Sequence, residues 1–319
     1  MDIGLFLPLE PAGRMPVEVY SGVIDVAQVA EDLGLHSMWV ASRHLSAEYA
    51  SVPSPLVLLA AVASATERIR LGTAVVSMPL EGTFRLAEDF ATLDAVSSGR
   101  ARLGVGSGDD PPAFEAMGVP FDSHKEVTSQ RVTDLIGIFD SGNVGGMKLH
   151  PPISDGKSKL ALGAQSVGGA KWAGELGIGL LQGRAEPGNL DPSASQAAAA
   201  RAYREVHSQG RVVTSRNAWV GSIEDPELTE AIARYDGYLR GRGRAPLPEG
   251  LAASVEKMHI LTGEPEELAT ELASDVAPIS PDELLVTVDP GGMEAGLIQK
   301  RLSELVPHLL ARIPNKEST

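Results

Sequence analysis

Cysteine is absent from this chain of 319 residues, and aromatic residues make up only 4% of it. Without cysteine the chain forms no disulfide framework and no thiolate metal site. The scarcity of aromatic rings argues against stacking-based recognition of single-stranded nucleic acid. No apolar run approaches the roughly 18 residues of a transmembrane helix, so the sequence predicts no membrane span.

Basic residues are also in the minority, with 27 lysines and arginines against 42 acidic residues and a net charge of −15. This charge disfavours polyanions and anionic membranes, so we expect no nucleic-acid or membrane partner. The N-terminal segment lacks the basic region and long apolar core of a signal peptide. No group of His, Asp and Glu has convincing metal-ligand spacing, so no metal site is predicted. These features favour a cytoplasmic enzyme.

Hydrophobic residues make up 43% of the chain, and short apolar runs alternate with helical patterns along it. Eight strands are predicted, at residues 3–9, 37–41, 69–77, 101–106, 159–163, 178–182, 211–220 and 283–289. This alternation predicts an α/β fold, a (β/α)8 TIM barrel, with a doubly wound sheet as the alternative. Segments 141–157 and 222–250 are rich in Gly, Pro and charge, and are interpreted as insertions or loops rather than domain boundaries.

The fourth predicted strand runs into glycines at alternate positions, Gly104, Gly106 and Gly108. Their spacing does not match the Gly-x-Gly-x-x-Gly of a dinucleotide fingerprint, and the acidic residue expected about twenty positions later is missing. In a barrel this turn lies at the carboxyl end of a strand, where active sites lie. Glycines here either let the backbone approach a ligand closely or simply form a tight turn. The following Asp109 and Asp110 are interpreted as a solvated turn.

A second turn of this kind follows the fifth strand and includes Gln165, Ser166 and Gly169. The N-terminus of the helix that follows is a candidate anion-binding site, because its free N–H groups and the positive end of its dipole attract negative charge. Ser166 serves there as a hydroxyl donor, as the N-cap, or as both. Lys125 is a further candidate for a phosphate contact. Its neighbours Ser123 and Glu126 are predicted to form a capping box.

Arg43 and His44 follow the second strand directly and so reach the same barrel end. A neutral imidazole transfers protons near pH 7, although a lone His is more often structural. Arg43 either pairs with an anion or lies in a solvated loop.

Four segments, in this order, resemble the bacterial luciferase-like monooxygenase family, which includes deazaflavin-dependent oxidoreductases. They are residues 30–40, 66–75, 86–108 and 171–177. The resemblance covers roughly residues 1–185, and it is looser in the C-terminal third. It implies a single TIM-barrel domain over 1–319 that binds flavin or deazaflavin at its strand ends.

The resemblance also implies roles for individual residues. Ala74 and Val75 resemble the family's β-bulge under the isoalloxazine ring, often with a non-proline cis peptide. Gly106 and Ser107 resemble contacts to the ring and to the phosphate side. The positions that match phosphate ligands of the luciferase-like branch are Lys125, Gln165, Ser166 and Gly169.

Two positions depart from the family pattern. Where members commonly carry Glu-His-His, this chain has Ser42, Arg43 and His44, so Arg43 replaces the His usually assigned the catalytic role. Ser107 stands where an Arg is common, which weakens the phosphate site. We therefore expect His44 to transfer protons and Arg43 to anchor peroxide or an anionic substrate.

These patterns predict an oxidoreductase, specifically a flavoprotein monooxygenase that uses reduced FMN and O2 on a small organic substrate. A flavin reductase is the expected partner, and the resemblance makes a homodimer plausible. Two alternatives stay open: a deazaflavin-dependent hydride-transfer enzyme, and a non-catalytic flavin-binding partner subunit.

Overall fold

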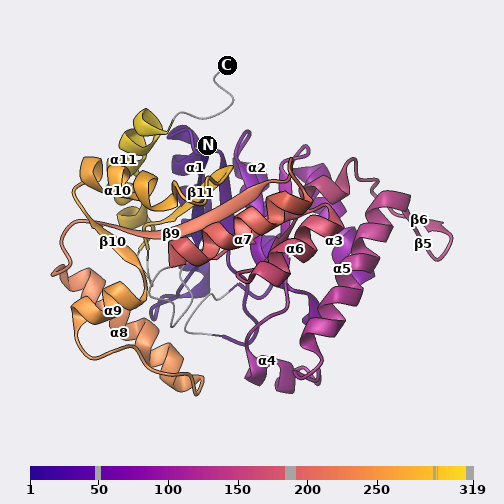
Figure 1. The fold of residues 1–319 in the computed structure, drawn as a ribbon, viewed down its shortest axis with the longest axis horizontal. Helices are drawn as coiled ribbons and strands as arrows, with labels where there is room; N and C mark the ends of the chain where they lie inside the picture. The colour runs from indigo at the N-terminus through magenta and orange to yellow at the C-terminus, as the bar shows by residue number, and fades with distance from the viewer. Residues whose placement is uncertain (47–51, 184–191, 290–291, 293, 314–319) are drawn as a thin grey trace.

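The computed structural model describes residues 1–46, 52–183, 192–289, 292 and 294–313. Eight parallel strands form a closed barrel (Figure 1). In chain order they are β1 (Asp2–Leu7), β2 (Ser37–Val40), β3 (Arg70–Ser77), β4 (Ala101–Gly106), β7 (Leu160–Gly163), β8 (Gly179–Gln182), β9 (Val212–Val220) and β11 (Glu283–Thr287). The barrel closes between β8 and β9, where Leu180 pairs with Val212. All eight predicted strands are confirmed within two residues, and the closure excludes a doubly wound sheet.

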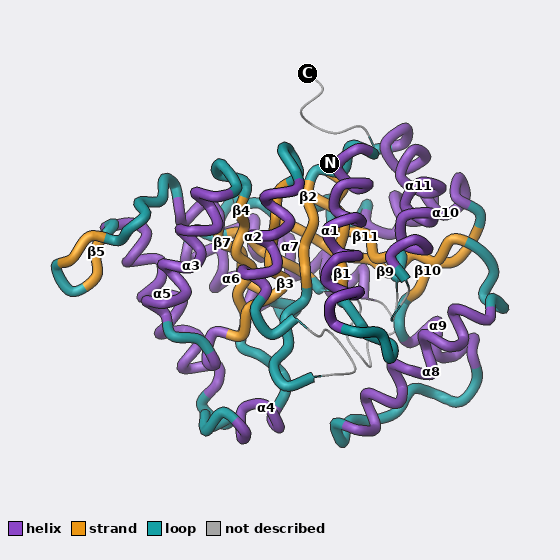
Figure 2. Tube along the Cα trace, turned by 180° about the vertical axis from the view of Figure 1, so that it is seen from behind, coloured by secondary structure: helices purple, strands orange, loops and turns teal. Residues whose placement is uncertain are grey.

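Helices cover the outside of the barrel on all sides (Figures 1 and 2). They are α1 (Pro16–Asp32), α2 (Pro55–Ala65), α3 (Thr83–Val96), α5 (His124–Ser141), α6 (Val167–Leu176), α7 (Pro192–Val206), α10 (Pro265–Val276) and α11 (Ala295–Arg312). Each buries an apolar face against the strands, as Leu302, Leu305 and Leu309 of α11 do. No helix within the described ranges is both long and apolar enough to cross a membrane.

Further elements lie at the ends of the strands. Below the barrel in Figure 1, α4 (Pro111–Ala116) lies on one side, and α8 (Pro226–Gly241) and α9 (Leu251–Lys257) lie on the other. Because α4 follows β4 and α8 follows β9, both flank the carboxyl ends of the strands. A ninth strand, β10 (Ile260–Gly263), extends the sheet by pairing with the second half of β9.

The interpretation of 222–250 as a loop is wrong for residues 226–241, which form the helix α8, whereas its interpretation as an insertion holds, because α8, α9 and β10 stand between the paired barrel strands β9 and β11. Leu228, Ala231, Ile232 and Leu239 recur at helical spacing and are buried, and Pro226 stands in the first helical turn, where it is tolerated. Segment 141–157 holds a short hairpin, β5 (Asn143–Val144) with β6 (Met147–Lys148), which projects from the body in Figure 2, and ends in the 3-10 helix η2 (Gly156–Lys159).

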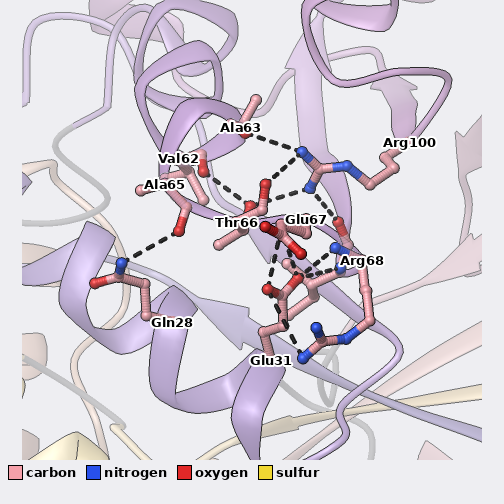
Figure 3. A network of polar contacts seen from close by, with 10 residues as sticks. Gln28, Glu31, Val62, Ala63, Ala65, Thr66, Glu67, Arg68 and Arg100 are labelled. Carbon is pink, nitrogen blue, oxygen red and sulfur yellow. Dashed lines mark hydrogen bonds and ion pairs between the residues drawn. The ribbon is translucent and has the colours of Figure 1, made fainter.

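The turn between α2 and β3 is held by a polar network (Figure 3). Arg100 donates to the carbonyl groups of Ala63, Thr66 and Ile69, each at 2.9 Å. The Glu31 carboxylate accepts three consecutive backbone N–H groups from the same turn. Burial alone would raise the pKa of Glu31, but these N–H donors lower it below its usual value. The network therefore fixes the start of β3, the strand that carries the bulge described next.

Candidate functional site

A cavity of about 440 Å³ opens at the carboxyl ends of the strands. This is the end of the barrel at which TIM-barrel enzymes carry their active sites. The cavity brings together seven of the ten predicted site residues: Arg43, His44, Ala74, Val75, Gly106, Ser107 and Gln165. Its other side chains are mostly apolar or aromatic and include Phe6, Leu80, Phe114, Leu181, Tyr235, Tyr238 and Leu285.

A bulge in β3 forms one wall of this cavity. The register against β4 shifts between Thr73 and Val76, and the Ala74–Val75 peptide bond is cis. Both features that the resemblance implied at Ala74 and Val75 are thus confirmed. The bulge turns the Val75 side chain toward the neighbouring strands β4 and β7.

Val75 packs between two glycines. A Cβ atom at Gly106 would lie 2.7 Å from Val75 Cγ2, and one at Gly163 would lie 2.9 Å from Val75 Cγ1. Both approaches are too close for a side chain at either position. The alternating glycines therefore serve the packing of the bulge, and Gly108, at φ +73°, serves the turn itself.

The interpretation of Asp109 and Asp110 as a solvated turn is wrong for Asp110; the side chain of Asp109 is 64% exposed, although it is held in ion pairs. Asp110 is only 5% exposed, and Arg242 Nη1 donates to both of its carboxylate oxygens at 3.0–3.1 Å. Asp109 pairs with Arg43 at 3.2 Å and with Arg244 at 3.1 Å. Three arginines from two distant segments thus converge on the two carboxylates, which ties the end of α8 to the turn after β4.

Tyr238 of α8 packs against this network. The guanidinium carbon of Arg43 lies 5.5 Å from the ring centroid, and that of Arg242 lies 5.9 Å from it. These distances are within cation–π range. Tyr235 stacks on Tyr238 at 6.1 Å and also lines the cavity. The aromatic wall of the site therefore comes from a helix that the sequence did not predict.

His44 lies inside the cavity with a side chain 14% exposed, and its Nε2 is 3.7 Å from Glu81 Oε1. Burial lowers the pKa of His44 below its usual value, against the opposing effect of Asp110. Burial, followed by the charge of Asp89, raises the pKa of Glu81, against Arg131. The imidazole is therefore neutral at pH 7, the form that accepts a proton.

Gln165 and Ser166 lie at the N-terminus of α6. Ser166 is the N-cap, as predicted, because its hydroxyl oxygen accepts the Gly169 N–H at 3.1 Å. Ser166, Gly169 and Lys125 are not among the residues that line the cavity, and Lys125 is exposed on α5.

The predicted capping box at the start of α5 is wrong. The Ser123 hydroxyl donates to the Pro120 carbonyl instead of capping the helix. Its oxygen accepts no N–H group of the first turn of α5, so this helix begins without a side-chain cap from Ser123.

The chain matches one family model, described as luciferase-like monooxygenase, over residues 1–278. The chain belongs to the luciferase-like monooxygenase family. Among curated relatives, a 4-hydroxyprotoasukamycin monooxygenase of Streptomyces nodosus subsp. asukaensis is 31% identical over 57% of this chain and 52% of that enzyme. The oxygenase component of a flavin-dependent trigonelline monooxygenase of Acinetobacter baylyi is 28% identical over 43% of this chain and 38% of its own length. The chain thus spans about half or less of these two luciferase-like relatives.

Solved structures of similar fold cover nearly the whole chain. Monooxygenase RslO1 from Streptomyces bottropensis superposes with a TM-score of 0.81 at 20% identity, over 98% of this chain and 99% of that one. An F420-dependent secondary alcohol dehydrogenase superposes with a TM-score of 0.72 at 18% identity, over 97% and 98%. At these identities the likeness shows the luciferase-like fold alone.

Sequence reasoning missed Glu81, Arg242, Arg244, Tyr235 and Tyr238. Glu81 follows the strand β3, which was predicted, so its place at the carboxyl barrel end was a usable signal. The other four lie in segment 222–250, which was interpreted as an insertion or loop. The helical spacing of its apolar residues was a usable signal for Tyr235 and Tyr238, whereas Arg242 and Arg244 follow the helix and had no local signal.

Proposed function

We propose that this luciferase-like protein is an FMN-dependent monooxygenase that receives reduced flavin from a separate reductase and acts on a small organic substrate. The observation that carries the proposal is the β3 bulge, with Val75 held between Gly106 and Gly163 at the wall of the 440 Å³ cavity. A planar ring system needs an apolar surface to lie on, and no neighbouring side chain can project into the space that the ring occupies. The two glycines provide such a surface beside Val75.

The residues at the site fit the group. Ala74, Val75 and Gly106 would support the ring, and the adjoining Ser107 and Gln165 supply neutral donors toward its tail. Ser166, Gly169 and the N–H groups at the start of α6 favour an anion beyond Gln165. Lys125 would add a point charge to the phosphate. When bound, reduced flavin supplies the electrons for the reaction with oxygen.

The protein's own residues position and protect the reacting groups. Apolar side chains of the cavity exclude water, and Tyr235 and Tyr238 offer an aromatic face to the substrate. Neutral His44 accepts a proton at Nε2, and Glu81 at 3.7 Å orients the ring and stabilises the charged imidazole. Arg43 places positive charge at the mouth, where it anchors an anionic reactant while it contacts Asp109.

Deazaflavin-dependent hydride transfer is the second candidate, and Ser107 favours it. With Ser in place of the Arg common in the family, Ser107 and Gln165 themselves offer the cofactor tail uncharged hydrogen-bond donors. The arginines nearby, Arg43 and Arg244, are paired with Asp109. The phosphodiester group of a deazaflavin cofactor carries one negative charge, whereas the phosphomonoester of FMN carries up to two, so the phosphodiester itself needs less compensation by cations. The similar fold of an F420-dependent dehydrogenase supports this candidate.

A titration of the purified chain with reduced FMN and, separately, with reduced deazaflavin tests the proposal. Monooxygenase function predicts tight binding of reduced FMN, oxygen uptake in air and a distinct absorbance transient. Tight binding of reduced deazaflavin with no response to oxygen would support hydride transfer instead. Failure to bind either cofactor, together with a stable complex with a second chain, would support a non-catalytic subunit.

The reductase partner and the site of action belong to the same proposal. A relative bears the name of an oxygenase component, which supports a two-component system in which the reductase is a different chain. We propose that the enzyme works in the cytoplasm, where a reductase is supplied with reduced nicotinamide. Homodimerisation remains a proposal from family resemblance, tested by the mass of the complex in solution.

A further inference from the structure

A second cavity, of about 200 Å³, lies at the opposite end of the barrel, where the strands begin. Its charged side chains come from the starts of five strands. They are Arg70 of β3, Arg102 of β4, Lys159 just before β7, Arg211 just before β9 and Glu283 of β11. Because parallel strands all start at one end of a barrel, the topology brings these residues to one place.

The two cavities are separated by the side chains inside the barrel. Trp39, Ala161 and Val213 face the lower cavity, and Phe6, Leu181 and Leu285 face the upper one. All six are buried members of a single apolar cluster. A ligand of the lower cavity would therefore not touch the proposed cofactor.

The lower cavity is basic, although the protein as a whole is acidic. Four basic side chains line it with one carboxylate, Glu283, in a chain of net charge −15. Arg211 Nη2 pairs with Glu283 at 2.9 Å and with Asp2 at 2.6 Å. Lys159 pairs with Asp94 at 2.6 Å. The nearby carboxylates are therefore already engaged by Arg211 and Lys159.

Arg102 has no such partner among the described residues. Its Nη1 donates to the backbone carbonyls of Ala101 at 2.7 Å and Gly99 at 3.4 Å. No described carboxylate lies within 4.0 Å of its guanidinium, and no described group accepts a hydrogen bond from Nε or Nη2. Burial, and then the positive charges of Arg70 and Arg211, lower the pKa of Arg102 to about 10. An anion beside Arg102 would offset this repulsion.

We propose that the lower cavity binds a small oxyanion, a phosphate or phosphomonoester group, held by Arg102 with Arg70 beside it. The planar fork of a guanidinium matches two oxygens of such a group. Since a water molecule occupies roughly 30 Å³ in the liquid, the 200 Å³ cavity holds the group together with a few waters. The site lies on the barrel face usually associated with stability, so its ligand is expected to stabilise the fold.

Inorganic phosphate is the probe, titrated into the cofactor-free full chain at constant ionic strength in chloride. We expect saturable binding by calorimetry and a saturable rise of Tm. Arg102→Gln should weaken phosphate binding about tenfold or more, because it removes a charged hydrogen-bonding partner. Arg102→Lys keeps the positive charge and loses the planar guanidinium, so it should weaken phosphate binding less than Arg102→Gln does. If Arg102→Gln does not fold, the weaker binding by Arg102→Lys tests whether Arg102 holds the phosphate.

Two controls distinguish phosphate bound at Arg102 from phosphate bound elsewhere on the protein. Arg85→Gln changes an exposed arginine of α3 and should leave phosphate binding unchanged. Ser166→Ala alters the start of α6, where the cofactor phosphate is proposed, so phosphate binding that persists in this variant and weakens in Arg102→Gln belongs to the lower cavity. Absence of saturable binding, equal binding by the Arg102 variants, or loss of binding in Ser166→Ala would each overturn the proposal.

Discussion

His44 Nε2 lies 3.7 Å from Glu81 Oε1, and the two side chains come from different strand ends of the barrel. The distance is longer than a direct hydrogen bond, so the pair is held by electrostatic attraction once the imidazole accepts a proton. A carboxylate beside a buried imidazole fixes ring orientation and stabilises the charged form. This relationship makes His44, rather than Arg43, the group suited to proton transfer.

Replacing His44 with Ala tests this role. We expect turnover to fall by about 10²- to 10⁴-fold, the usual contribution of general acid–base catalysis, with unchanged affinity for the cofactor. Steady-state oxygen uptake and a flavin binding titration measure the two quantities. His308→Ala, at an exposed position of α11, is the control and should behave like the parent. Unchanged turnover in His44→Ala would remove His44 from the mechanism.

The lowered pKa of His44 also predicts how stability depends on pH. Burial disfavours the protonated imidazole in the folded state, so the unfolded chain takes up the proton first as the pH falls below about 6.5. The free energy of unfolding should therefore decrease between neutral pH and the lower pKa of the folded state. His44→Gln should show a smaller decrease in urea denaturation across pH 5 to 8.

In His44→Gln the free energy of unfolding should still decrease somewhat as the pH falls. Burial likewise lowers the pKa of His36 at the other end of the barrel, so His36 contributes to the same window. A pH dependence identical in the parent and in His44→Gln would show that His44 titrates equally in both states.

The start of α6 is the proposed phosphate position, and Ser166→Ala tests it. The substitution removes the N-cap hydrogen bond to Gly169, at a cost of about 1 kcal/mol of stability. We expect weaker binding of FMN and unchanged binding of riboflavin, which lacks the phosphate. Fluorescence titration compares the two ligands directly. An equal loss for both would place the phosphate elsewhere.

Much of the barrel follows from local sequence patterns, while its site depends on distant contacts. Each strand is a short apolar run, and the glycine turn after β4 lies at a strand end that the alternation predicts. The partners of Asp109 and Asp110 are 135 and 132 residues away in Arg244 and Arg242. No local pattern pairs charges over such a separation, so the two carboxylates resembled a solvated turn.

Gly104→Ala tests why glycines recur at alternate positions along β4 and the turn that follows it. A Cβ atom at Gly104 would collide with the carbonyl oxygen of Thr73 at the bulge. We expect a loss of about 1–3 kcal/mol in the free energy of unfolding, as for other overpacked cores. Gly137→Ala is the matched control, since nothing lies near its Cβ inside α5, and Ala should stabilise that helix by about 0.5–1 kcal/mol. Equal effects of the two changes would mean that Gly104 is not required by packing.

Arg242→Met tests whether the arginine network holds α8 over the cavity. Asp110 is 5% exposed and accepts two bonds from Arg242, so the substitution leaves a buried carboxylate with Arg43 at 3.6 Å as its remaining ion-pair partner among the described residues. The free energy of unfolding should fall by about 1–3 kcal/mol, the usual effect of removing a bond to a buried charge. Tyr238 would lose one of its two guanidinium contacts, which should also weaken substrate binding. Arg240→Met, in an exposed pair on the same helix, should leave both quantities unchanged. If Arg242→Met has no more effect than Arg240→Met in urea denaturation, the network does not secure this side of the site.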